Sequence, residues 1–120
     1  MKPLLIALAL ALTALPANAH ETAKGPNGGR VADAGSYHVE LVARGDALEA
    51  FLTDGSEKPI APAGFKGTAL FVVDGKPQRI PLEPEGARLA GKSSIPLPAS
   101  PKGAVQITSP DGKTASARFN

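Results

Sequence analysis

The chain contains two histidines, His20 and His38, and the position of the first makes it a candidate ligand for a metal ion. His20 directly follows Ala17-Asn18-Ala19, a small-x-small tripeptide of the kind that a signal peptidase selects. Cleavage after Ala19 would make His20 the first residue of the processed chain. An N-terminal histidine offers an α-amine and an imidazole nitrogen from one residue, and copper(II) favours such nitrogen ligands in a tetragonal arrangement.

The second histidine stands two residues before a carboxylate, Glu40, in a segment with the pattern of a β-strand. Residues two apart on a strand project from the same face about 7 Å apart, so His38 and Glu40 can reach one ion. An extended arm over residues 20–28 spans up to about 30 Å and could bring His20 to them. The expected site is a histidine brace of the His20 amine, the His20 imidazole and the His38 imidazole, with Glu40 or Glu21 as a weaker oxygen ligand.

Interpretations without a metal remain open at both histidines. Any residue can follow a cleavage site, and an exposed strand histidine is usually solvated or paired with a carboxylate on a neighbouring position. Catalysis has little support, because Ser36, Ser93 and Ser94 have no nearby histidine in the sequence and there is no cysteine for thiol chemistry or thiolate metal sites. We therefore expect no enzymatic turnover.

Residues 1–19 have the organisation of a signal peptide. Met1-Lys2 supplies a positive start, residues 3–15 are largely leucine and alanine, and the sequence turns polar from His20 onward. The apolar stretch is shorter than the roughly 20 residues that a membrane-spanning helix needs. We expect an exported protein with no membrane span after processing. Together with the missing cysteines this points to the periplasm, although the sequence does not distinguish it from full secretion.

The remaining residues, 20–120, suffice for one small domain, which we divide into a flexible arm over 20–28 and a β domain over 29–120. The complete chain has 13 Lys and Arg against 11 Asp and Glu, and the two signs are interspersed throughout the sequence. A nucleic-acid partner is not expected, because such proteins cluster Lys and Arg on one face. The sequence also contains no basic amphipathic helix of the type that lies on membranes.

Glycine and proline separate short apolar segments, as they do in a domain of many strands. The clearest signal is a hairpin over residues 37–53 with a two-residue turn at Gly45-Asp46. One register sorts its side chains into two faces and assigns His38 and Glu40 to the outer one. The apolar pairs of that register are Ala43 with Leu48, Leu41 with Ala50, and Val39 with Leu52.

Two further turns, Asp74-Gly75 and Ser109-Pro110-Asp111-Gly112, predict two more hairpins. Pro77 and Pro81 cannot donate hydrogen bonds to a ladder, which favours an edge position for the strand after Asp74-Gly75. With short strands near residues 29–32 and 88–92, the total is seven or eight. This number predicts an all-β, immunoglobulin-like β-sandwich, with a small β-barrel as the alternative.

The runs Gly25-Pro26-Asn27-Gly28-Gly29-Arg30-Val31 and Gly35-Ser36-Tyr37-His38-Val39-Glu40-Leu41-Val42 resemble small exported bacterial proteins associated with metal resistance. They are also similar to an N-terminal segment of the periplasmic adaptor subunits of heavy-metal efflux pumps. The resemblance covers the arm and the first hairpin, and it implies periplasmic metal handling with His20 and His38 as the matching imidazoles. Those relatives commonly carry histidine where this chain has Asn27.

These observations together predict a small exported protein that binds copper(II) for buffering or for delivery to an efflux component. Zinc(II) is the second candidate metal. The alternative is a β-sandwich of the cell envelope that binds no metal and contacts another protein through its hairpin edges and the proline-rich segment 95–101.

Overall fold

The computed structural model describes residues 23–120, which form nine β-strands and no helix. The all-β prediction is therefore confirmed, and no helix in this part of the chain could cross a membrane. The leader, His20 and Glu21 lie outside the described residues. The strands are β1 (Ala23–Lys24), β2 (Arg30–Ala34), β3 (Tyr37–Arg44), β4 (Ala47–Thr53), β5 (Lys66–Val73), β6 (Lys76–Glu85), β7 (Arg88–Lys92), β8 (Lys102–Thr108) and β9 (Thr114–Phe119).

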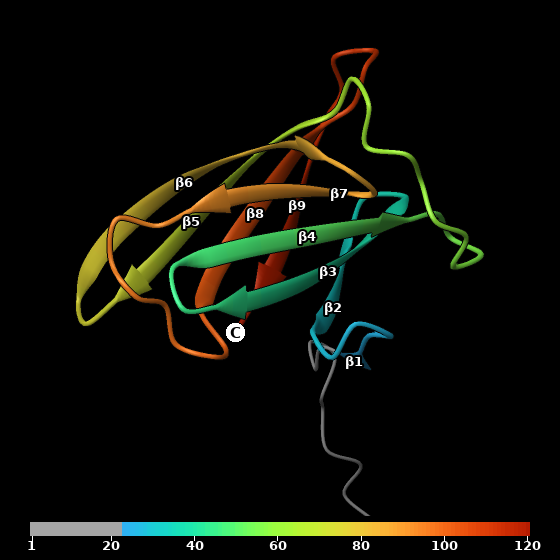
Figure 1. The fold of residues 1–120 in the computed structure, drawn as a ribbon. Helices are drawn as coiled ribbons and strands as arrows, with labels where there is room; N and C mark the ends of the chain where they lie inside the picture. The colour runs from blue at the N-terminus through green and yellow to red at the C-terminus, as the bar shows by residue number, and fades with distance from the viewer. Residues whose placement is uncertain (1–22) are drawn as a thin grey trace, which may run out of the picture.

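All neighbouring strands are antiparallel, and their order across the sheet is β1-β2-β3-β4-β7-β6-β5-β8-β9. The sheet curls into a half-barrel, so that β3, β4 and β7 lie in front of β5, β8 and β9 (Figure 1). β6 makes the turn between the two halves, because it pairs with β5 through residues 76–82 and with β7 through residues 83–85.

The predicted register of the first hairpin is confirmed in full. Arg44 pairs with Ala47 across Gly45-Asp46, and Gly45 has φ of 62°, as the first central position of a type II′ turn requires. The same Gly-X pattern closes two hairpins for which the sequence indicated only single short strands. These are β2–β3 at Gly35-Ser36 and β6–β7 at Gly86-Ala87.

The other two predicted hairpins are also present. Asp74 and Gly75 both have positive φ, 52° and 75°, which is the type I′ geometry that Asp-Gly favours. In the turn between β8 and β9, Ser109 N donates to Lys113 O at 2.9 Å and Gly112 N donates to Ser109 O at 2.9 Å.

The prediction that the second strand of the middle hairpin is an edge strand is wrong, because β6 lies between β5 and β7. Two of its three prolines, Pro77 and Pro81, nevertheless lie outside the β7 ladder, whereas Pro84 lies within it, opposite Leu89. Pro77 and Pro81 pair with Val72 and Thr68 of β5, whereas the residues of β6 that pair with β7 are 83–85. A strand that changes partners along its length thus accommodates prolines that a fully paired inner strand would exclude.

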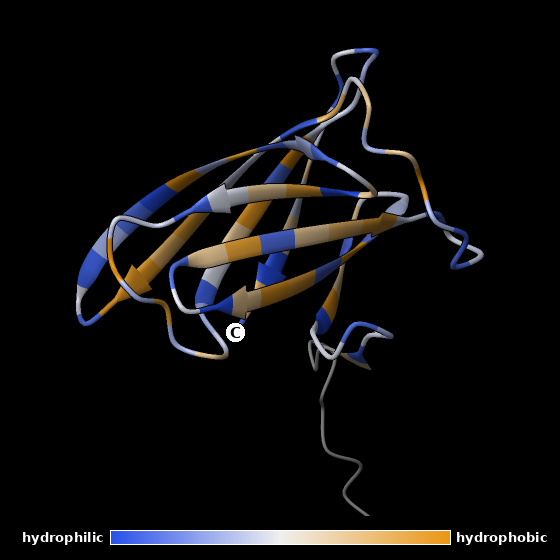
Figure 2. Ribbon diagram, viewed as in Figure 1, coloured by the Kyte–Doolittle hydropathy of each residue, from blue (hydrophilic) through white to orange (hydrophobic). Residues whose placement is uncertain are grey.

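The core fills the inside of the curled sheet, and the strands alternate apolar and polar residues around it (Figure 2). The proline-rich segment 95–101 contributes the buried residues Leu97 and Pro101 to this core, and Leu97 N donates to Gly45 O at 2.8 Å. The largest fully buried side chains are Phe71, Phe119, Leu48, Ile80, Leu82, Leu89, Ile107, Val39, Val105 and Pro101.

Arg30 connects β2 to the far end of the sheet. Its guanidinium donates to Asn120 O at 3.2 Å and to Pro101 O, and it lies 5.4 Å from the centroid of the Phe119 ring. Partial burial lowers the pKa of Arg30 below its ordinary value, although an arginine remains charged in proteins. Arg30 therefore links β2, near one end of the sheet order, to β9 at the other end.

Candidate metal site on strands β2 and β3

His38 is the second residue of β3 and lies between Asp33 of β2 and Thr53 of β4. Its Nε2 is 3.3 Å from Asp33 Oδ1, and the side chains are 28% and 79% exposed, respectively. The Gly35-Ser36 turn sets this pairing, because it fixes Ala34 opposite Tyr37 and hence Asp33 opposite His38. The result is an imidazole–carboxylate pair at the surface.

Asp33 is a site residue that the sequence reading missed. The Gly35-Ser36 pair is typical of a two-residue hairpin turn. Such a turn pairs Ala34 with Tyr37 and therefore predicts that Asp33 lies opposite His38. A carboxylate in this position can accept an N–H from the imidazole, or it can offer an oxygen to a metal. Metal-binding histidines commonly hold a carboxylate on one ring nitrogen and the metal on the other, so the pair is compatible with either role.

Glu40 does not lie at the surface, so the assignment of this side of β3 to an outer face is wrong at this position. Its side chain is only 4% exposed. The two carboxylate oxygens accept hydrogen bonds from Asn27 N at 2.8 Å, Asn27 Nδ2 at 2.8 Å and Gly29 N at 2.9 Å. These three charge-assisted bonds hold the loop over residues 25–29 against β3.

The glycines of this loop make the close approach possible. A Cβ on Gly25 would overlap the Glu40 carboxylate, and one on Gly29 would come within 2.8 Å of Val42 Cγ2. Gly25 N also donates to Gly29 O at 2.9 Å, which closes the loop on itself. The loop over residues 25–29 is therefore packed against β3, with the Glu40 carboxylate at the centre of the contact.

The part of the expected flexible arm that the structure describes, residues 23–28, has defined partners. β1 pairs with β2, with Ala23 opposite Val31 and Lys24 opposite Arg30. Because the pairing is antiparallel, the backbone at Ala23 points along β2 from Val31 toward Asp33. Ala23, the first described residue, thus lies opposite a residue two positions from Asp33.

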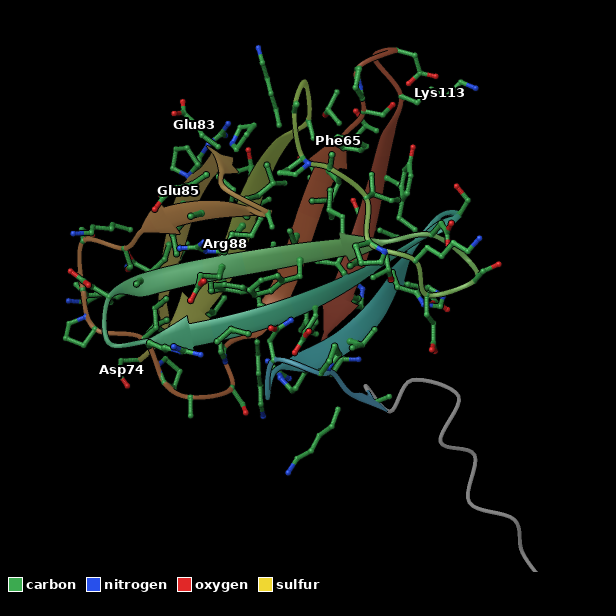
Figure 3. All side chains as sticks on the ribbon, turned by 45° about the vertical axis from the view of Figure 1, so that its right-hand side comes forward. Phe65, Asp74, Glu83, Glu85, Arg88 and Lys113 are labelled. Carbon is green, nitrogen blue, oxygen red and sulfur yellow. The ribbon has the colours of Figure 1, made fainter. Side chains whose placement is uncertain are left out.

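A second ion-paired cluster lies on the neighbouring strands β4, β7 and β6. Arg88 of β7 forms an ion pair with Glu49 of β4, and its Nη2 is 3.7 Å from Glu85 Oε1 (Figure 3). The pairs join three neighbouring strands and leave Arg88 about one-third exposed.

Within residues 23–120, no three histidine, cysteine, aspartate or glutamate side chains converge as a metal site would require. The structure brings His38 together with Asp33 and keeps Glu40 under the loop, while His20 and Glu21 lie outside this range. No protein-family model, curated protein or solved structure matches the chain.

Proposed function

We propose that this chain is an exported protein of the periplasm that binds copper(II) through its processed N-terminus and His38. The observation that carries the proposal is the antiparallel pairing of β1 with β2, in which Ala23 lies opposite Val31, two residues from Asp33, the neighbour of His38. Copper(II) would be buffered or passed to an efflux component, and zinc(II) is the second candidate ion. No turnover is part of this proposal.

The distances along the chain support such a site. Asp33 is two residues beyond Val31, or about 7 Å along β2. Three residues connect Ala23 to His20 and span up to about 10 Å. An extended segment from Ala23 back to His20 would therefore be long enough to bring the His20 amine to the His38 imidazole.

The proposed ligands are the amine and imidazole nitrogens of His20 and the imidazole of His38. Asp33 orients the His38 ring or supplies an oxygen, and Glu21 is a further oxygen candidate. Glu40 becomes a positioning residue, because both of its oxygens hold the loop that carries β1. Copper(II) suits a set that is rich in nitrogen ligands.

For the architecture, we infer a flattened, partly open barrel in preference to an immunoglobulin-like sandwich. The continuous order of the strands supports this, since β6 joins the front and back halves through backbone pairing. At the opposite side, Arg30 of β2 contacts Phe119 of β9 and the carbonyl of Asn120. The proposed metal site lies on β2 and β3, beside this second junction.

Calorimetric titration of copper(II) into the processed protein tests the site. We expect one equivalent to bind. Copper affinity should decrease more than about 100-fold when an alanine precedes His20 or when His38 is replaced by alanine. Loss of a ligand should exceed the effect of losing a residue that only supports a ligand, which lowers metal affinity by about 10–100-fold. Asp33→Asn should fall within that smaller range. The mass of the processed protein must first show a start at His20.

Two results would count against the proposal. Unchanged affinity after the N-terminal extension would remove the amine from the ligand set. If no stoichiometric copper or zinc binding occurs, the metal function fails and the metal-free envelope module becomes the better interpretation.

Copper affinity should also decrease as the pH is lowered below about 8, because amine and imidazole ligands must lose their protons before they bind a metal. Titrations at a series of pH values measure this directly, with the His38→Ala variant as the control. The variant should show a shallower decrease, since it has one fewer proton to displace. An affinity independent of pH would indicate carboxylate ligands only.

A further inference from the structure

The outward face of β5, β6, β8 and β9 combines exposed aliphatic side chains with unpaired cations. On β5 the exposed positions include Leu70, which is 41% exposed, and Val72, which is 60% exposed. They are the large hydrophobic residues that the described part of the chain leaves exposed. The apolar colour toward the end of β5 is visible in Figure 2. We call the surface around them the basic-apolar face.

The strand register places cations beside both aliphatic residues. Leu70 lies between Arg79 of β6 and Ala104 of β8, and Ala104 in turn lies opposite Arg118 of β9. Val72 lies between Pro77 of β6 and Lys102 of β8. Buried and exposed positions alternate along these four strands, and all of these side chains lie on the side that faces away from the core. The members of the face are Lys66, Thr68, Leu70, Val72, Pro77, Arg79, Pro81, Lys102, Ala104, Gln106, Ser116 and Arg118.

Among the carboxylates of residues 23–120, those that border this face lie at its ends. Glu83 follows the last pair of the β5–β6 ladder, and Asp74 occupies the hairpin turn at the other end (Figure 3). Among the described residues, none of the cations Lys66, Arg79, Lys102 and Arg118 forms an ion pair. The whole chain has a formal charge of only +2, so the fold concentrates positive charge here.

We propose that the basic-apolar face binds the surface of a membrane that contains anionic phospholipids. The cations would contact phosphate groups, while Leu70 and Val72 enter the boundary between headgroups and acyl chains. Cations near such a surface are attracted individually, and buried aliphatic area adds to the binding. A second copy of the chain is a poor occupant, because two positive faces repel each other.

The size and composition of the face favour a membrane over an acidic protein. Strands about 4.8 Å apart and side-chain rows about 7 Å apart give a patch of roughly 15 by 14 Å around the two aliphatic residues. A stable protein interface buries about 800 Å² on each partner and is enriched in aromatic residues. The members of this face include no aromatic side chain. The proposal is independent of copper binding.

Co-sedimentation with lipid vesicles tests the proposal on the processed, full-length protein. Vesicles with about one-third phosphatidylglycerol in phosphatidylcholine are compared with pure phosphatidylcholine. We expect binding to the anionic vesicles only, with loss at high salt. The double variant Arg79→Gln/Lys102→Gln should bind roughly 25-fold more weakly, at about fivefold for each charge. Leu70→Ser/Val72→Ser should weaken binding as well.

The matched control is Lys58→Gln/Lys92→Gln, which removes two exposed cations outside the face and should bind nearly as the parent does. Circular dichroism of each variant confirms that it is folded, and all variants share one N-terminus. Equal loss in the control, or equal binding to neutral vesicles, would overturn the proposal. Binding to an acidic peptide such as polyglutamate but to neither kind of vesicle would overturn it too, and would assign the face to an acidic protein.

Discussion

Replacing Glu40 with alanine is expected to destabilise the protein by about 3 kcal/mol, because hydrogen bonds to a charged group contribute about 1.5–3 kcal/mol and the lost donors remain partly buried. Asn27 N, Asn27 Nδ2 and Gly29 N would all lose their acceptor. Urea unfolding measures the change in the free energy of unfolding. The loop over residues 25–29 should also become susceptible to proteolysis.

The same substitution separates a positioning role from a ligand role. If Glu40 only holds the loop and β1, Glu40→Gln should restore much of the stability, since an amide oxygen can still accept the two backbone N–H groups. Copper affinity should then recover together with stability. A variant that recovers stability but still binds copper as weakly as Glu40→Ala would show that the carboxylate itself contacts the metal.

Replacing Gly91 with valine should have a comparable or larger effect on stability, about 3 kcal/mol or more. A Cβ at Gly91 would overlap the carbonyl oxygen of Pro81, and it would lie 3.0 Å from Leu82 Cδ2 and 3.1 Å from Ile80 Cγ2. Overpacking a core commonly costs 1–3 kcal/mol, and here the nearest atom is backbone, which cannot rotate away. The melting temperature should fall on the order of 15 °C.

Gly55→Ala is the matched control for this variant. Its nearest atom beyond the chain neighbours would be Ser36 O at 4.0 Å, so a methyl group has space. Its stability should remain within about 0.5 kcal/mol of the parent protein. If Gly91→Val melts at the temperature of the parent, β6 and β7 do not approach each other as closely as the structure indicates.

The first hairpin could be predicted from the sequence because a single register brings apolar residues together on one side of both strands. β1 could not be predicted, since two residues with exposed side chains carry no periodic pattern. The burial of Glu40 was missed for a related reason. The alternation of apolar and polar residues along β3 predicts on which face of the sheet each side chain lies. It does not predict that the loop over residues 25–29 covers the face that carries Glu40.

The candidate site was predicted in part. His38 was correctly placed on β3, whereas its neighbour Asp33 depends on a hairpin that was not recognised. Positive and negative residues are interspersed along the sequence, but this order does not predict how they are distributed on the surface of the folded protein. Arg79, Lys102 and Arg118 are far apart in sequence, and only the β6-β5-β8-β9 order gathers them on one face.

The contact between Arg30 and Asn120 has a consequence for the order of events during folding. It joins residues 90 apart in the sequence, so its formation requires the closure of a very long loop. Each local hairpin can form once its two strands have been synthesised. β2 can pack against Phe119 only after β9 has been synthesised as well. The sheet is therefore completed late, after the local hairpins have formed.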